Sequence, residues 1–302
     1  MKNHGFVLTA GLAILKTLLL AIVFTIANMA AIFLSPFSES FRQLPAGPPV
    51  RSILSLLVLG FWNAIVLGMV VSRTRWGGIK TSLCLILIFW TVAYGLTQVE
   101  TIIFSESLAA ISIYDALMLM ISGFFTLIIF IPSGVALHGG FSRQYNPLQD
   151  ERKRLTNRAV KYGVLAVLYV VVYFAFGHFI AWQFADLRLF YSGTTENRGL
   201  LYQISTSLHL IPLQLLRGLV FVLAADGLRY VMNKDKAAYV AAVTLLFMSS
   251  GVMLLAPNPI FPDAVRIGHL LELLSSMLVF GLITGFIMDA SPRQDILKLS
   301  MR

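Results

Sequence analysis

The sequence predicts an all-α fold: a polytopic transmembrane helix bundle of about eight spans, in a single integral membrane domain that covers residues 1–302. Three observations predict it. Of the 302 residues, 58% are hydrophobic and only 12% are charged, about half the charged share of a soluble globular protein. The mean hydropathy is +0.81. Apolar runs of about 20 residues, the length that crosses a bilayer, recur along the whole chain.

Each expected span is one such apolar run, bounded by Gly, Pro or charged residues that are typical of loops. The runs differ in how many polar residues interrupt them, and the third, fifth, sixth and eighth runs carry most of the acidic and histidine side chains. We expect the spans at about 8–34, 52–72, 81–104, 113–137, 160–184, 204–230, 238–256 and 266–288.

The basic residues predict how the bundle sits in the membrane. They concentrate after the second, fourth, sixth and eighth spans, while the other connections carry Arg42, Arg51, Arg188, Arg198 and Arg266. By the positive-inside rule this places both termini in the cytoplasm, in a cell membrane of the bacterial inner-membrane type. The net charge of +9 is thereby explained by short loops between spans, and we expect no nucleic-acid partner.

The chain divides into two similar halves. Residues 1–138 and 158–302 would each hold four spans, joined by a polar cytoplasmic loop at 139–157. Both halves end their second span in a basic loop, and Asp115 and Met118 stand where His269 and Glu272 stand in the other half. This predicts a parallel repeat of four plus four spans, one known way of building transport proteins. The alternative is that any two four-span halves resemble each other by composition.

The last span begins with a stripe of polar residues. Arg266, His269, Glu272 and Ser276 follow one another at spacings of three, three and four, which places all four on one helix face. Ionisable residues inside a membrane are functional by default. His269 and Glu272 could form a proton relay, or hold one metal ion from a single helix. They could also form a hydrogen-bonded pair in which Glu272 fixes the tautomer of His269.

Two further charges lie inside predicted spans. Arg217 falls near the middle of the sixth span and needs a partner, either Glu272, Glu100 or an anionic substrate. Pro212 would kink the helix beside it. Gln98 and Glu100, two residues apart near the end of the third span, point to roughly opposite sides of a regular helix. We therefore expect only one of them, Glu100, to face the site.

Three histidines complete the candidate set. His178, His209 and His269, with Glu272, would lie at one depth and could bind zinc, copper or non-haem iron, or ligate haem. The spacing contains no paired-histidine motif, so the alternative for each is a hydrogen bond between helices. The cofactor is therefore unknown, with a metal ion or haem as the two candidates.

These observations leave three functions open. The first is a transporter or binding protein whose polar cavity opens to the outer side, with Glu100, Arg217, His269 and Glu272 holding a small molecule, an ion or a proton. The second is a membrane-embedded metal- or haem-dependent enzyme that acts on a lipid-like or quinone-like substrate. The third is a subunit of a membrane complex, or a homo-oligomer. The sequence contains no P-loop, nucleophile elbow or dinucleotide fingerprint that would favour an enzyme class.

Overall fold

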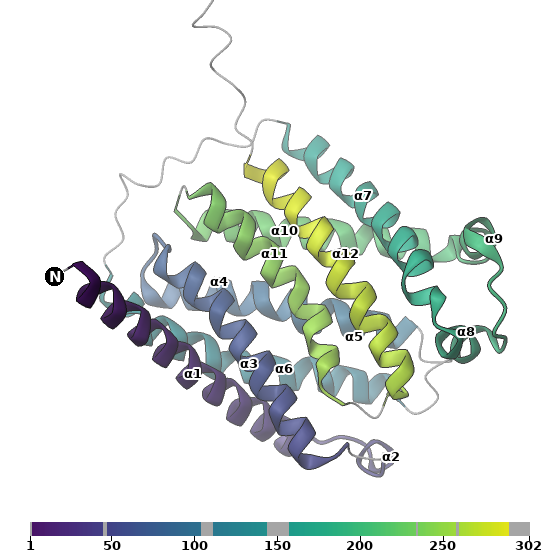
Figure 1. The fold of residues 1–302 in the computed structure, drawn as a ribbon, viewed down its shortest axis with the longest axis horizontal. Coiled ribbons are helices and arrows are strands. Elements are labelled where there is room, and N and C mark those ends of the chain that lie inside the picture. Colours follow the sequence, from purple (N-terminus) through teal and green to yellow (C-terminus); the bar gives the residue numbers. More distant parts are fainter. Residues whose placement is uncertain are drawn as a thin grey trace, which may run out of the picture.

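A computed structural model describes residues 2–44, 47–103, 111–143, 157–233, 235–257 and 260–289, with only the backbone of residues 2–9. Eight helices in these ranges are long and apolar enough to cross a membrane. They form one helix bundle (Figure 1). The predicted fold class is confirmed, and each predicted span matches one of these helices. The eight are Ala10–Leu34, Pro49–Ser72, Gly78–Ile103, Ile113–Leu137, Arg158–Gln183, Leu208–Val231, Lys236–Leu255 and Asp263–Asp289.

Long helices make the spans and short ones cover one end of the bundle. The long helices are α1 (Lys2–Leu34), α3 (Pro49–Ser72), α4 and α5 (Gly78–Trp90 and Leu96–Ile103), α6 (Ile113–Leu137), α7 (Arg158–Phe179), α10 (Ile211–Val231), α11 (Lys236–Val252) and α12 (Asp263–Asp289). The short helices are α2 (Glu39–Arg42), α8 (Ala185–Ser192) and α9 (Gly199–Thr206). In Figure 1 these three lie at the end of the bundle opposite the N-terminus.

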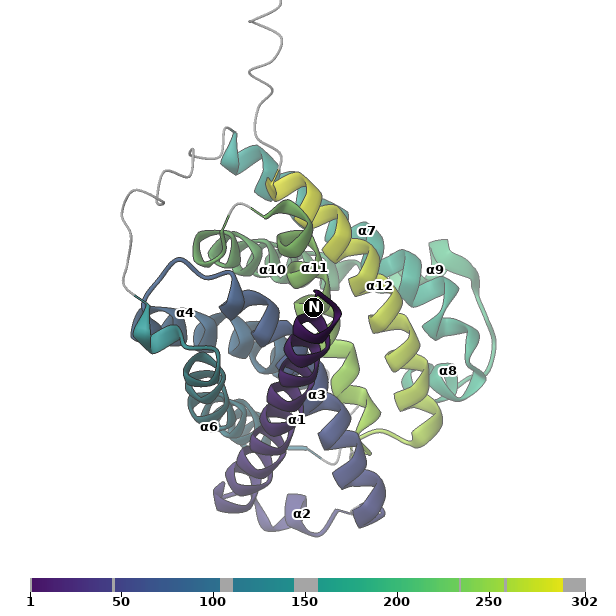
Figure 2. The ribbon, with the colours of Figure 1, turned by 60° about the vertical axis from the view of Figure 1, so that its left-hand side comes forward.

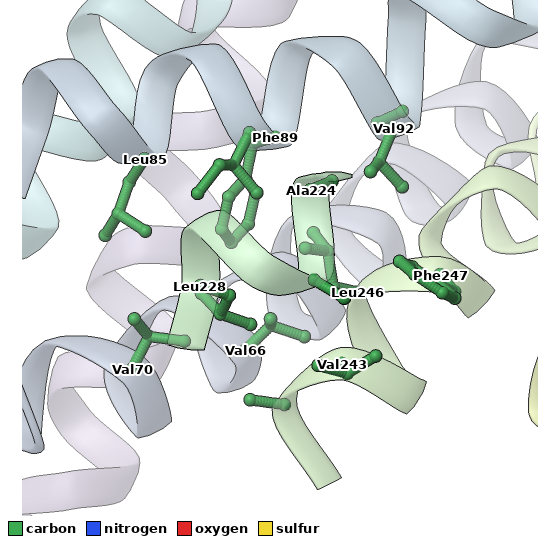
Figure 3. Close-up of a cluster of buried hydrophobic side chains, with 14 of the residues drawn as sticks. Val66, Val70, Leu85, Phe89, Val92, Ala224, Leu228, Val243, Leu246 and Phe247 are labelled. Carbon is green, nitrogen blue, oxygen red and sulfur yellow. The ribbon is translucent and has the colours of Figure 1, made fainter. Parts of the chain in front are cut away.

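The core lies where the second, third, sixth and seventh spans meet. Phe89 and Val92 of the third span pack there with Leu228 of α10 and Phe247 of α11, all fully buried (Figure 3). By contrast, α1, α6 and α7 each carry rows of exposed leucine, isoleucine, valine or phenylalanine. Because this arrangement buries the middle helices and leaves apolar faces on the outer ones, it suits a bundle surrounded by lipid.

The two halves repeat the same set of helix contacts. In the N-terminal half, α1 packs on α3 and α6, and α4 packs on α6. In the C-terminal half, α7 packs on α10 and α12, and α11 packs on α12. Between the halves, α3 packs on α11 and α10 packs on α4. If α1, α3, α4 and α6 are matched in order with α7, α10, α11 and α12, each of these contacts has a counterpart. For example, the α3–α11 contact corresponds to the α10–α4 contact. Figure 2 shows α1, α3 and α6 on one side and α7 and α12 on the other.

A short backbone bridge joins the halves. Thr74, just after the second span, pairs antiparallel with Met232, just after the sixth. Two hydrogen bonds accompany it, from Arg75 N–H to Val231 O at 3.2 Å and from Asn233 N–H to Arg73 O at 2.8 Å. These two bonds exchange with each other when the halves are exchanged, because Arg73, Thr74 and Arg75 lie 158 residues before Val231, Met232 and Asn233, respectively.

The third span is not a uniform α-helix. A π-helical turn, Thr91–Gly95, separates α4 from α5. The indole N–H of Trp90 donates to the carbonyl of Met120 on α6 at 2.8 Å and fixes the helix just before this turn. Such turns rotate the residues that follow them and occur often at functional sites. Here the rotated segment is α5, which carries Gln98 and Glu100.

The start of the sixth span differs from the sequence prediction. Gln203 and Thr206 belong to the separate helix α9, and the chain then passes through a 3₁₀ turn, Leu208–Leu210, into α10. Pro212 lies in the first turn of α10, where its missing N–H leaves no hydrogen bond broken. The expectation that Pro212 kinks the helix is therefore wrong, because it stands where a helix begins.

The predicted link between the halves lies mostly outside the described residues. Of the loop 139–157, the structure describes residues 139–143, which include a 3₁₀ turn at Gly140–Ser142, and Asn157 before α7. The basic residues at 152–154 and at the C-terminal end of the chain also fall outside the described ranges.

Candidate functional site

A large cavity among the described residues brings most of the predicted site residues together. It encloses about 840 Å³, within the roughly 300–1,000 Å³ of small-molecule sites, and lies at the end of the bundle near α8 and α9. Both halves line it. Its polar lining includes Asn28, Tyr94, Thr97, Gln98, Glu100, Thr101, Ser122, Tyr173, Tyr191, Glu196, Arg198, Gln203, His209, Arg217, His269, Glu272 and Ser276.

Arg217 of α10 pairs with Glu100 of α5. Its Nη1 donates to Glu100 Oε1 at 2.8 Å and to Gln214 Oε1 at 3.0 Å. The guanidinium also lies over the ring of Tyr169, 5.8 Å from its centroid, within reach of a cation–π interaction. Arg217 is 4% exposed, whereas Glu100 is 28% exposed. The partner of Arg217 is thus Glu100 among the three that the sequence left open, and the carboxylate is the more exposed member of the pair.

His269 and Glu272 of α12 form a second pair. His269 Nδ1 lies 2.9 Å from Glu272 Oε2, and His269 Nε2 lies 3.0 Å from the hydroxyl of Tyr191 on α8. Burial, with Glu100 and Glu272 nearby, raises the pKa of Tyr191, so its hydroxyl keeps its proton. A neutral His269 then donates from Nδ1 and accepts at Nε2, and a protonated one donates from both. Both charge states of His269 fit this geometry.

The other oxygen of Glu272 lies beside Gly177. A Cβ at Gly177 would stand 3.7 Å from Glu272 Oε1 and 3.9 Å from Gln203 Nε2. Gln203 Oε1 in turn accepts a hydrogen bond from His178 Nδ1 at 3.0 Å. The missing side chain at Gly177 therefore leaves space between a carboxylate and an amide at the cavity wall.

The four predicted metal ligands are only partly brought together. His209, His269 and Glu272 line the cavity, while His178 lies behind Gln203 and is buried. Over the described ranges, no three His, Cys, Asp or Glu side chains gather into a group that could hold a metal ion. His269 pairs with the carboxylate of Glu272, which lies on the same helix, α12.

The polar stripe of the last span separates into two parts. His269, Glu272 and Ser276 line the cavity, as their common helix face predicts. Arg266 instead donates to Asp263 Oδ1 at 2.8 Å and to the carbonyl of Leu254 at the end of the seventh span. These bonds hold the first turn of α12 against the 3₁₀ turn that ends the seventh span.

Gln98 lies on the cavity wall together with Glu100. The expectation that only one of them faces the site is therefore wrong. At about 100° per residue, Thr97 and Thr101 lie between Gln98 on one side and Glu100 on the other. Both threonines line the cavity, so the cavity covers nearly half the circumference of α5.

Sequence reasoning missed the residues that other elements bring to the site. Tyr191, Gln203 and Tyr94 reach the cavity from α8, α9 and the π-helical turn. Tyr191 stood in an aromatic cluster after the fifth span that is typical of a membrane interface. No signal in the sequence linked it to His269.

Comparisons with protein-family models, with curated proteins and with solved structures gave no match. The function must therefore be argued from the site itself.

Proposed function

We propose that this multi-pass membrane protein binds a small organic cation in the cavity and transports it across the membrane. The observation that carries the proposal is the environment of Glu272. Its carboxylate lines the cavity, is only 9% exposed, and has an imidazole as its ion-pair partner. A buried carboxylate needs a compensating positive charge, which either a proton on His269 or a bound cation can supply.

The charges around the cavity support a cation over an anion. The lining contains Arg198 and Arg217 against Glu100, Glu196 and Glu272. Arg217 is already bonded to Glu100, and Arg198 to Glu196 at 3.2 Å. The arginines are therefore engaged, and the excess charge of the lining is negative. Tyrosine rings at positions 94, 173 and 191 add aromatic faces, which attract organic cations.

His269 links cation binding to protons. The groups around it are Glu272 on its own helix, Tyr191 on α8, and the ring of Phe261, with the charge of Glu100 nearby. A proton on His269 neutralises the pair with Glu272 and competes with a bound cation. Because imidazole changes charge between about pH 5 and 8, cation binding should weaken as the pH falls through this range.

The repeated contacts of the two halves support transport over simple binding. We propose that residues 1–138 and 158–302 are a parallel repeat, related by an axis that passes through the Thr74–Met232 bridge. In transporters built from repeats, the substrate site lies at the interface between them. The cavity is lined from both halves, and the Arg217–Glu100 pair connects α10 of one half to α5 of the other.

Uptake into proteoliposomes tests the proposal. Radiolabelled N-methyl-4-phenylpyridinium is a suitable probe, because its permanent charge cannot carry a proton. We expect the purified protein to accumulate it when a pH gradient is imposed, and Glu272→Gln to abolish this pH-dependent uptake. Glu39→Gln is the matched control, since Glu39 is exposed on α2 and does not line the cavity. Full uptake by Glu272→Gln would overturn the proposal.

The enzyme and the complex subunit remain predictions from the sequence. Elemental analysis and an absorption spectrum of the purified protein test the metal or haem directly. A stoichiometric metal or a Soret band that the triple change His178→Ala, His209→Ala, His269→Ala removes would favour the enzyme. A protein that co-purifies in fixed ratio and tolerates each single site change would favour the subunit.

A further inference from the structure

The part of the cavity that faces the N-terminal half carries polar groups without charge. Asn28 of α1, Tyr94 of the π-helical turn, Gln98 of α5 and Ser122 of α6 all line the cavity and are buried. The charged groups Glu100, Arg217 and Glu272 come from α5 and from helices of the other half. The cavity thus has a neutral polar side and a charged side, with α5 between them.

Gln98 is the unpaired member of the neutral side. It is 8% exposed, and its Oε1 is buried without a hydrogen-bond partner among the described residues. Asn28, on the same side of the cavity, instead donates to Tyr94 and Thr126 at 3.4 and 3.5 Å. A buried amide oxygen without a donor costs about 1–3 kcal/mol in general. An unpaired amide on the wall of a binding cavity therefore points to a donor that arrives with the ligand.

The face of α5 sets the distance between the two sides. Gln98 and Glu100 stand at the two edges of the cavity-lining face, with Thr97 and Thr101 between them. A helix with its side chains is about 10–12 Å wide, so groups at opposite edges lie about 10 Å apart. A ligand lying across Thr97 and Thr101 can reach both edges.

We propose that the cation bound in this cavity carries a hydroxyl or amide group several ångströms from its charge, and that this group donates a hydrogen bond to Gln98. The inference rests on the proposed cation site. It assigns the ligand class as an amphipathic cation with one uncharged hydrogen-bonding end. The charged side, where Glu272 is not matched by an arginine, holds the cation, the aromatic and aliphatic lining holds the middle, and Gln98 selects for the polar end.

A matched pair of probes tests it. Tetraphenylphosphonium has a charge and no hydrogen-bonding group, and [4-(hydroxymethyl)phenyl]triphenylphosphonium differs by one hydroxymethyl group. Equilibrium dialysis against the purified full-length chain gives both dissociation constants. We expect the hydroxymethyl compound to bind about 2- to 10-fold more tightly, the gain of one hydrogen bond. In Gln98→Met, which keeps the length of the side chain, the two constants should become equal while that of tetraphenylphosphonium stays within about twofold.

Gln203→Leu is the control variant, because Gln203 lines the same cavity but is bonded to His178; it should leave the ratio of the two constants unchanged. If Gln98→Met does not fold, Gln98→Asn should still lower the ratio, since its amide is one carbon shorter. Equal binding of both probes to the unaltered protein, or a ratio that survives both changes at Gln98, would overturn this inference alone. If neither probe binds, or if Glu272→Gln leaves tetraphenylphosphonium binding intact, the proposed function fails with it.

Discussion

The two halves of the bundle share a packing framework. Gly60 of α3 lies against Ala21 and Phe24 of α1, and Gly218 of α10 lies against Ala166 and Tyr169 of α7. A Cβ at either glycine would stand 2.7 Å from its neighbour, the Ala21 carbonyl or the Tyr169 Cβ. Gly60 and Gly218 have the same separation in sequence as Thr74 and Met232. The matching contacts show that α1 and α3 approach each other as closely as α7 and α10 do.

The same framework carries different chemistry on its two sides. The residue before Gly60 is Leu59 and the residue before Gly218 is Arg217, and both line the cavity. The contacts of the two glycines match Ala21 with Ala166, 145 residues apart, and the same offset makes Ile32 of α1 correspond to Gly177 of α7, both of which line the cavity. The helix contacts are thus repeated, while the charged lining residues other than Glu100 lie on the C-terminal side.

The loop anchors show the same contrast. Asp115 at the start of α6 accepts hydrogen bonds from Ser38 N–H at 2.9 Å and from its hydroxyl at 2.7 Å, and so holds the loop that contains α2. His269, near the start of α12, holds α8 through Tyr191 at 3.0 Å. Both anchors tie down the connection between the first two spans of their own half. The aspartate suits a fixed anchor, whereas the histidine can change charge near neutral pH.

The largest loss of stability is expected when Arg217, a charged residue of the C-terminal half, is replaced by the apolar residue found at the matching position of the N-terminal half. Arg217→Leu copies Leu59 and leaves Glu100 without its partner, which should lower the free energy of unfolding by about 3 kcal/mol. Adding Glu100→Gln should recover most of this loss, because no unpaired charge then remains. Thermal unfolding of the two single variants and the double variant in detergent measures the coupling. Simple additivity of the two losses would show that the pair is not coupled.

The shared framework predicts two equal effects. Gly60→Ala and Gly218→Ala should each destabilise the protein by about 1–3 kcal/mol, since the added methyl group has to push apart two closely packed helices. Unfolding curves for both variants check this. Gly163→Ala is the control, because nothing lies within 4 Å of a Cβ placed there. A large loss for one glycine and none for the other would break the comparison.

The open space at Gly177 can be closed with the residue that the other half uses. Gly177→Ile should fill the gap between Glu272 and Gln203 and reduce phosphonium binding about tenfold, with little change in thermal stability because the cavity offers room. Equilibrium dialysis measures the binding and unfolding curves the stability. Undiminished binding would place the ligand away from Glu272.

The smallest effect concerns the helix starts of the third and seventh spans. Asp235 caps α11 by accepting from Ala238 N–H at 3.1 Å, whereas Gly77 caps α4 without a side-chain bond. The bond from Ala238 and the nearby Arg73 lower the pKa of Asp235. A lowered pKa in the folded state means that the stabilisation is present above about pH 4, the ordinary range of aspartate, and fades as the pH falls below it. Asp235→Ala should therefore lower Tm slightly at pH 7, and this difference should shrink in acid.

The sequence predicted the number and positions of the spans well, because an apolar run long enough to cross a bilayer can be recognised without knowing which helices pack against it. It also predicted the His269–Glu272 contact, since neighbours three residues apart on a helix need no tertiary information. The partner of Arg217 could be narrowed to three candidates but not chosen. That choice depends on how α5 is rotated, and the π-helical turn before it has no clear sequence signal. Tyr191 and Gln203 escaped prediction for a related reason, since connections between spans brought them to the cavity.

The Thr74–Met232 bridge has a mechanical consequence. It lies after the second and sixth spans, while Leu56 of α3 and His209 before α10 line the cavity at the other ends of those spans. The two spans are 24 residues long each, which amounts to a lever of about 36 Å. If one half rotated against the other with both backbone hydrogen bonds kept, the bridge would be the pivot of that rotation. A tilt of a few degrees there displaces the cavity walls by a few ångströms, while the pivot itself scarcely moves.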